Sequence, residues 1–405
     1  MFKKNKYFQV IRKPRKEDKY SDYDLINTYK DKKVTIKYLV KEMNKNYLLL
    51  IYKINHFYIS MIFINKKNHL PIKIDLAFSI GWNNFEINNN NIFIKELLLL
   101  PSEQQIDVNN IYQKLIYGGI LETKTISNLN YNINKYENLF LQNFSISLIK
   151  NKKISIFKKF YLRFKILNRN DLFFNIYKSI YFYIKDKLNL RYSYQNYILK
   201  FSGVDGVGKS SIVIFFLTIF SNFKIPIKHI HLLPAFLPQP HKIINFIMNK
   251  KTNIDYSKPY INIKHKGSII SYIKYVYYFF LFHLNHLIEK YYFFKGYFYI
   301  YDRWYLDYWI DLKRTGINLE LKKFPSLVKK NKYSLNFLLF AKTKLILSRK
   351  KELTEDKINE LNIKYRKYIK FSNLNVIDTN SIFKKSINDV LKKVDDYNKK
   401  QIYKI

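Results

Sequence analysis

The residues best suited to chemistry in this chain lie together in one glycine-rich stretch. Residues 203–210 read Gly-Val-Asp-Gly-Val-Gly-Lys-Ser, which fits the pattern G-x-x-x-x-G-K-[S/T]. In this pattern backbone N–H groups turn toward phosphate oxygens, and the positive end of a following helix adds to the attraction. Lys209 then reaches the β- and γ-phosphates of ATP, and the Ser210 hydroxyl holds Mg²⁺. The predicted nucleotide-binding residues are Gly203, Val204, Asp205, Gly206, Val207, Gly208, Lys209, Ser210 and Ser211.

The sequence on either side of this stretch supplies the context that such a loop requires. An apolar run at 197–201 precedes it and predicts a buried strand, and the run at 212–217 follows it and opens a helix. The alternative is an ordinary glycine-rich turn, but such a turn does not explain why lysine and serine stand at the two positions that the pattern requires. We therefore predict a loop that binds nucleotide phosphates.

Length and composition limit the classes of protein to which the chain can belong. With 405 residues the chain is long enough for two domains. A hydrophobic content of 48% excludes general disorder, and the lack of cysteine excludes disulfides, thiolate metal sites and thiol catalysis. Charged residues follow the N-terminus, and the most apolar window, 275–287, is too short to span a bilayer. We expect a cytoplasmic protein with no secretory signal and no transmembrane segment.

The net charge of +42 is spread along the chain and not gathered in one stripe. Only nine of the 72 basic residues are arginine, and lysine, asparagine and isoleucine are abundant throughout, as an AT-rich genome produces. A basic surface attracts polyanions weakly, and nucleotide substrates are anions as well. We therefore expect no dedicated nucleic-acid binding.

Three regions differ in their pattern. Residues 1–125 alternate strand-like runs with one helical period at 33–44, which predicts an α+β domain. Residues 126–194 are rich in lysine, asparagine and aromatic residues and predict a helical connecting region. From 195 to 405 strands and helices alternate, as in an open α/β sheet.

A second motif supports the glycine-rich loop. The apolar run 299–301 ends in Asp302-Arg303-Trp304, and with the loop it resembles the thymidylate kinases, which place an Asp-Arg-Tyr element at a strand end. The resemblance implies an α/β fold of the P-loop nucleoside monophosphate kinase type, with a parallel sheet flanked by helices. It implies that Asp302 binds Mg²⁺ through water or orients the acceptor, and that Arg303 grips the acceptor phosphate. Taken alone, the pair also fits a surface Asp–Arg pair.

The same family has a basic lid that closes over the transferring phosphoryl group. Here the run 336–340 predicts a strand, and Leu-Ser-Arg-Lys-Lys-Glu-Leu-Thr follows at 347–354. When the loop itself lacks a basic residue, the resemblance implies that the lid supplies the catalytic arginine. Since Gly206 adds no basic side chain to the loop beyond Lys209, Arg349 is the candidate, and its cation would stabilise the γ-phosphoryl in the transition state. A solvated basic helix start is the alternative.

The resemblance extends over residues 197–380, somewhat under half of the chain, and narrows to a divergent branch. That branch is associated with capsule and lipopolysaccharide gene clusters and carries an extra N-terminal domain. Its second strand ends in a His-x-Arg-Pro element, whereas this chain reads His231-Leu-Leu-Pro, with Leu233 in place of the arginine. The substitution removes an anion contact and leaves the identity of the acceptor open.

Three carboxylates stand out in the N-terminal region: residues 21–25 read Ser-Asp-Tyr-Asp-Leu, and Asp75 lies within a later strand-like run. In these residues the region resembles nucleotidyltransferase-like domains, with Asp75 where that fold carries its third carboxylate. The resemblance implies a second metal site at Asp22, Asp24 and Asp75, because three carboxylates hold two Mg²⁺ ions for nucleotidyl transfer. The glycine-serine turn that precedes the pair in the family is absent, so we predict a degenerate domain. A solvated acidic turn is an equal alternative.

These observations predict a thymidylate kinase-like phosphotransferase. It would transfer the γ-phosphoryl of MgATP to a small acceptor, a nucleotide or an envelope-glycan precursor, with ATP and Mg²⁺ as cofactors. The catalytic candidates are Lys209, Asp302, Arg303 and Arg349, and Ser210 with Asp302 is the metal pair. The alternatives are a true dTMP kinase, an ATP-binding regulator without turnover, and nucleotidyl transfer by the first domain. Thymidylate kinases are often dimers, so the resemblance also allows a homodimer.

Overall fold

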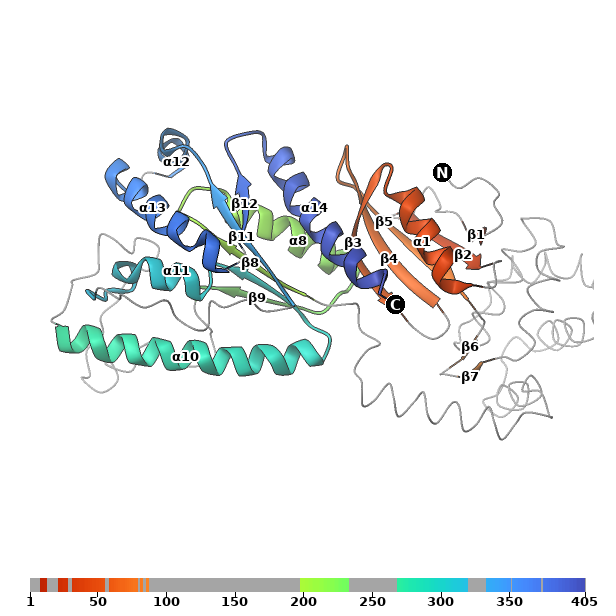
Figure 1. Cartoon of the computed structure of the whole chain (residues 1–405), viewed down its shortest axis with the longest axis horizontal. Helices are drawn as coiled ribbons and strands as arrows, with labels where there is room; N and C mark the ends of the chain where they lie inside the picture. Colours follow the sequence, from red (N-terminus) through yellow and green to blue (C-terminus); the bar gives the residue numbers. More distant parts are fainter. Residues whose placement is uncertain are drawn as a thin grey trace, which may run out of the picture. The chain divides into compact units, whose positions relative to one another are not determined.

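The structure is a computed structural model of the chain, and it describes residues 8–12, 21–27, 31–54, 58–78, 81–82, 85–86, 197–232, 268–319, 333–350, 352–372 and 374–404 (Figure 1). Two compact units are present. The first comprises Met1–Tyr47 and Tyr52–Tyr192, and the second comprises Leu48–Ile51 and Ser193–Lys404. Among the described helices, none combines the length and the apolar character that crossing a membrane requires.

The second unit is built on a sheet of five parallel strands in the order β12-β11-β8-β10-β9. Both β8 and β10 are buried along their whole length, which is why their sequences are nearly continuous apolar runs. The strand order reverses at β8, because β10 and β9 lie on one side of it and β11 and β12 on the other. Ligands of such sheets bind at the carboxyl ends of the strands where the order reverses. The strands are β8 (Ile198–Ser202), β9 (Ile227–His231), β10 (Phe298–Asp302), β11 (Ser334–Phe340) and β12 (Asn375–Asp378).

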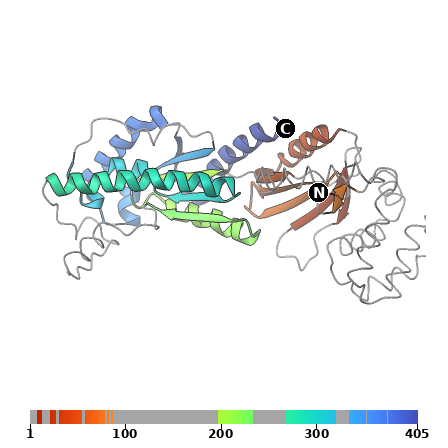
Figure 2. The same cartoon turned by 90° about the horizontal axis from the view of Figure 1, so that it is seen from below.

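Helices cover both faces of this sheet. Phe201 of β8 packs against Phe216 of α8 (Lys209–Asn222), with ring centroids 6.2 Å apart. The neighbouring Lys200 points to the opposite face, where its Nζ lies 3.6 Å from Glu289 of α10 (Ser268–Phe294). Alternate residues of one strand thus face α8 and α10, so the two helices lie on opposite sides (Figure 1). In Figure 2, the view from below, α10 lies in front of the strands.

Further helices follow the strands β10, β11 and β12. The segment after β10 forms α11 (Tyr305–Ile310) and the 3₁₀ helix η3 (Leu312–Thr315). After β11 come α12 (Thr343–Arg349) and α13 (Glu355–Ser372), and α14 (Phe383–Ile402) follows β12. The carboxyl edge of the sheet is therefore bordered by the starts of α8 and α11 and by the segment between α12 and α13.

The strands β1, β2, β5 and β4 of the first unit belong to a mixed sheet in the order β1-β2-β5-β4-β3. The strand β2 pairs in parallel with β5, and β5 pairs in antiparallel with β4. Helix α1 (Lys32–Met43) begins after Asp31, whose side chain accepts hydrogen bonds from two backbone N–H groups, and it lies beside this sheet (Figure 1). The other elements are β1 (Phe8–Arg12), β2 (Ser21–Asn27), β3 (Tyr47–Ile54), β4 (Tyr58–Asn65), β5 (Pro71–Ala77), β6 (Gly81–Trp82) and β7 (Phe85–Glu86).

The predicted alternation of strands and helices after residue 195 is confirmed, and so is a parallel sheet flanked by helices. In the first unit, Pro71 is the first residue of β5, a position where a strand tolerates proline. The predicted connecting region 126–194 lies outside the described residues, as does Leu233. The predicted domain boundaries at 125 and 194 remain predictions.

Candidate active site

The glycine-rich loop joins the carboxyl end of β8 to the first turn of α8. Gly203, Gly206 and Gly208 have φ angles of +139°, +87° and +96°, a region that side chains rarely adopt. At Gly203 a Cβ atom would lie 2.6 Å from the backbone oxygen of Leu339 in β11. At Gly206 it would lie 3.2 Å from Ile346 of α12. Gly203 and Gly206 are therefore needed both for the path of the loop and for its close packing, and Gly208 for the path.

The Lys209 side chain turns back into this loop. Its Nζ donates hydrogen bonds of 2.8 Å to the carbonyl oxygens of Gly203 and Val204, and the residue is only 5% exposed. Burial, and then the nearby Arg303 charge, lower the pKa of Lys209 to about 7. An anion bound in the loop would oppose both effects and favour the ammonium form. The site is thus suited to a phosphate that pairs with this lysine.

Ser210 and Asp302 meet at the same edge of the sheet. The Ser210 Oγ donates a hydrogen bond of 2.6 Å to Asp302 Oδ2. Asp302 is the last residue of β10, whose backbone runs beside β8 with Asp302 opposite Phe201. Asp302 is 4% exposed, and its Oδ1 is buried with no hydrogen-bond partner in the described part of the chain. A hydroxyl beside a carboxylate with a spare oxygen is a donor set that fits Mg²⁺.

Two arginines converge on Asp205 within the loop. Its carboxylate oxygens accept hydrogen bonds from Arg303 Nη2 and Arg314 Nη1, and its side chain is 11% exposed. Burial alone would raise the pKa of Asp205, but Arg303, Lys209 and Arg314 outweigh it and hold that pKa well below its usual range. Arg303 thus lies against the loop, since its Nη1 also lies 3.3 Å from the Gly203 carbonyl oxygen.

The predicted lid residue Arg349 ends α12 beside the loop. Its Nη1 lies 3.5 Å from the carbonyl oxygen of Gly206, and its Nη2 lies 3.3 Å from that of Thr379, which follows β12. The helix α12 passes close to the loop at Ile346, where a Cβ atom on Gly206 would leave only 3.2 Å. All four predicted catalytic side chains, Lys209, Asp302, Arg303 and Arg349, therefore gather around one loop.

Sequence reasoning did not single out two further residues of this site, Arg314 and Asp307. Arg314 lies in η3 and pairs with Asp205, eleven positions after the Asp-Arg motif. Asp307 lies in α11 and accepts a hydrogen bond of 3.1 Å from the N–H of Gly203. Asp307 has a sequence signal, because an acidic residue near the start of a short helix after a strand favours a cap. Arg314 has no signal of this kind.

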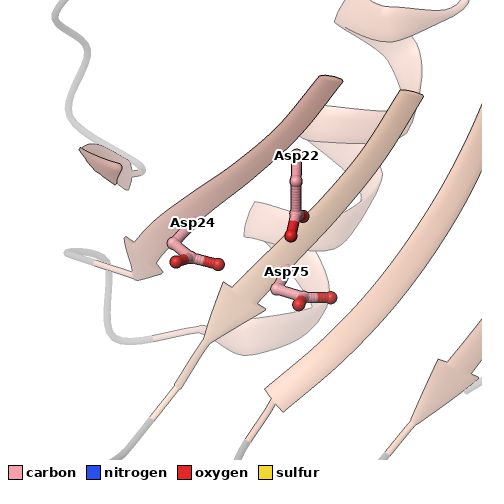
Figure 3. A group of neighbouring side chains, drawn as sticks. All are labelled: Asp22, Asp24 and Asp75. Atoms are coloured by element: carbon pink, nitrogen blue, oxygen red, sulfur yellow. The ribbon is translucent and has the colours of Figure 1, made fainter. Parts of the chain in front are cut away.

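The three predicted carboxylates of the first unit also come together (Figure 3). Asp22 and Asp24 lie on β2 and Asp75 on β5, with Asp24 and Asp75 directly opposite each other. One oxygen from each lies within 4.8 Å of the others. Lys73 Nζ lies 2.6 Å from Asp75 Oδ2 and 3.6 Å from Asp22 Oδ1. Asp22 and Asp24 are on a strand, so the alternative of an acidic turn is wrong.

Comparisons with known proteins identify no family for this chain. No protein-family model matches the chain, and no curated protein sequence matches it. Among solved structures the chain is similar to a deoxyadenosine kinase from M. mycoides with bound dATP. The two are 15% identical, the match covers 49% of this chain and 99% of that kinase, and the TM-score is 0.29. A TM-score this low supports no conclusion about the function of this chain.

Proposed function

We propose that the second unit is a P-loop phosphotransferase of the thymidylate kinase-like type. It transfers the γ-phosphoryl group of MgATP to a nucleotide or an envelope-glycan precursor. The observation that carries the proposal is the pairing of Ser210 with Asp302, 2.6 Å apart, at the mouth of the glycine loop that holds Lys209. A turn that serves structure alone has no need of a buried carboxylate oxygen without a partner.

The predicted site residues have distinct roles in this reaction. The loop N–H groups and Lys209 hold the β- and γ-phosphates, and Ser210 with Asp302 would hold Mg²⁺, which neutralises phosphate charge when bound. An oxygen of the acceptor's phosphate forms a bond to the γ-phosphorus while the bond from that phosphorus to the bridging oxygen breaks, and ADP leaves with the electron pair. Arg349 stabilises the charge on the phosphoryl oxygens as they separate, and Arg303 positions the acceptor.

The proposal is tested by ADP release from MgATP by the purified chain, with and without dTMP and sugar-nucleotide acceptors. The variant Lys209→Ala should abolish release, whereas Lys364→Ala, which changes a lysine on α13 with 44% side-chain exposure, should not. Stimulation by dTMP would identify a dTMP kinase, and stimulation only by a glycan precursor would support the envelope assignment. ATP binding without ADP release would favour a regulator, and a lack of ATP binding would overturn the proposal.

A second candidate function, nucleotidyl transfer by the first unit, is supported by the convergence of Asp22, Asp24 and Asp75. Three carboxylates on two adjacent parallel strands are a donor set that fits divalent cations. The ammonium of Lys73 already neutralises part of this charge, which supports a degenerate site. Pyrophosphate release that is abolished by Asp24→Ala and retained by Lys209→Ala would establish this activity.

A further inference from the structure

Asp307 is the most heavily hydrogen-bonded carboxylate described in the second unit. Its side chain is 1% exposed at the start of α11. Oδ1 accepts hydrogen bonds from the Gly203 N–H at 3.1 Å and the Tyr365 hydroxyl at 2.7 Å. Oδ2 accepts from the Ser202 hydroxyl at 2.8 Å and the Trp304 N–H at 3.1 Å. Arg303 completes the set, with its Nη1 at 3.6 Å from Oδ1.

These partners come from separate parts of the fold. Ser202 and Gly203 form the junction between β8 and the loop, and Tyr365 lies on α13, the helix that follows the lid segment. Trp304 and Arg303 belong to the turn after β10, where Arg303 has a φ of +72°, uncommon for a residue with a side chain. A single buried charge thus ties the base of the loop to the Asp-Arg turn and to α13. Hydrogen bonds to a charged acceptor are the stronger kind.

Gly203 is held from both sides by groups of the site. Its N–H donates to Asp307, while its carbonyl oxygen accepts from Lys209 at 2.8 Å and lies 3.3 Å from Arg303 Nη1. The direction of this glycine therefore sets where the lysine and the arginine can lie. We propose that Asp307 is a positioning residue for nucleotide binding: it fixes Gly203 and Arg303 so that the loop is formed before the nucleotide arrives.

This inference rests on the proposed function, since it assigns Asp307 to the same nucleotide site. Asp307 lies beneath the loop and acts through Gly203 and Arg303, without contact to the nucleotide. An asparagine has the same size but only one acceptor oxygen, so its amide would face the Ser202 and Trp304 donors or those of Gly203 and Tyr365. The variant Asp307→Asn should therefore loosen the loop while leaving the packing volume unchanged.

The matched control is Glu289→Gln. Glu289 is likewise a buried carboxylate of the second unit, accepting from the Tyr301 hydroxyl at 2.6 Å and pairing with Lys200, but it lies on α10 and its partners belong to β10 and β8, not to the loop. Its loss should lower stability without altering the loop. A comparison of the two variants separates a general loss of a buried charge from a loss of loop positioning.

The experiment measures the Kd for MgATP with a fluorescent ATP analogue, beside thermal unfolding of the nucleotide-free chain. We expect Asp307→Asn to weaken binding by about tenfold or more, and Glu289→Gln to lower the melting temperature with an unchanged Kd. Tyr365→Phe removes one donor and should weaken binding by a few-fold, which tests the inference even if Asp307→Asn does not fold.

The inference, but not the proposed function, is overturned if Asp307→Asn binds MgATP with unchanged affinity. If that variant does not fold, unchanged affinity in Tyr365→Phe overturns it. The inference is also overturned if Glu289→Gln weakens MgATP binding as much as Asp307→Asn does. Failure of the unsubstituted chain to bind MgATP overturns the proposed function as well.

Discussion

The hydroxyl of Ser210 donates to the carboxylate of Asp302 across 2.6 Å, although 92 positions separate the two residues in the chain. The pair exists because α8 begins at the carboxyl end of β8 and β10 ends beside it. The remaining oxygen, Asp302 Oδ1, is buried and lacks a hydrogen-bond partner among the described residues. A cation ligated there would relieve the cost of that buried oxygen.

The first prediction concerns this pair. Asp302→Asn should raise the Mg²⁺ concentration for half-maximal ADP release by about tenfold or more, because an amide is a much weaker cation ligand than a carboxylate. The measurement is a Mg²⁺ titration at saturating ATP. Asp378→Asn is the control, since Asp378 ends the parallel strand β12 but accepts hydrogen bonds from its own turn at Asn380. Equal effects in both variants would contradict the assignment.

The second prediction concerns the protonation of the Lys209 side chain. Burial lowers the pKa of Lys209 from 10.5 to about 7, so between these values the native side chain is neutral while the unfolded one is charged. The stability of the nucleotide-free chain should therefore rise with pH across this window. Nucleotide binding at pH 8 should take up close to ~1 proton as the ammonium forms. Calorimetry in two buffers of different ionisation enthalpy measures this uptake. Lys209→Met should remove it, and uptake that persists there would exclude Lys209 as its source.

The third prediction compares two glycines of the loop. Gly203→Ala should cost about 1–3 kcal/mol of unfolding free energy and abolish ATP binding, because its Cβ would lie 2.6 Å from the Leu339 oxygen at a φ of +139°. Gly208→Ala places a Cβ in nearly open space, 4.0 Å from Arg349, at a φ of +96°. It should retain more stability than Gly203→Ala. Urea unfolding of both variants measures which of them is less stable. If Gly208→Ala were the less stable variant, the loop would follow a path that differs from the one described.

The fourth prediction separates two glutamates with a similar pKa. Burial would raise the pKa of Glu289, but Lys200 and three hydrogen-bonding or charge contacts lower it to about 2. For Glu360 the pKa is also about 2, first through hydrogen bonds from Lys357 and Lys364. The Glu360 side chain is 45% exposed, against 3% for Glu289. Solvent therefore screens the Glu360 pairs, whereas loss of Glu289 leaves the Lys200 ammonium buried without its partner.

Glu289→Ala should thus cost about 3 kcal/mol of unfolding free energy, and Glu360→Ala less than ~1 kcal/mol. Both folded-state pKa values lie below the ordinary 4.5, so this stability is present above pH 4.5 and is lost as the pH falls toward 2. Thermal melts between pH 2 and pH 7 measure the difference. Similar losses in the two variants would mean that burial does not decide the effect.

The fifth prediction concerns the first unit. Lys73→Ala should strengthen Mn²⁺ binding, because it removes the ammonium that pairs with Asp75 and Asp22. Electron paramagnetic resonance of free Mn²⁺ measures the affinity. Asp24→Asn in the Lys73→Ala background is the control and should weaken binding. An unchanged Mn²⁺ affinity in Lys73→Ala would argue against a cation site at these carboxylates.

The glycine loop and the Asp-Arg motif were readable from the sequence because their chemistry depends on residues adjacent in the chain. The apolar runs at 197–201 and 299–301 predicted buried strands, and both lie within or overlap β8 and β10. The meeting of Asp22, Asp24 and Asp75 was expected only from a resemblance, and the structure brings them together.

What the sequence did not reveal depends on pairing between distant segments. Arg303 was predicted to hold the acceptor phosphate, but no spacing indicates that its guanidinium also pairs with Asp205 of the loop. The position of Arg314 depends on the turn of η3 back toward the loop. The role of Asp307 depends on five donors, one of which, Tyr365, is 58 positions away. Such contacts are decided by the order of strands in the sheet, which periodicity does not determine.

The distances along the chain between these partners also bear on how the protein folds. The hydrogen bonds from Ser202 and Gly203 to Asp307 span 105 and 104 positions, so the loop cannot reach its described form until β8, β10 and α11 are all in place. Contacts this distant in sequence form late, because the chain must first close long loops. Recovery of phosphate binding during refolding would therefore follow, and never precede, assembly of the parallel sheet. A nucleotide analogue would serve as a probe of its last folding step.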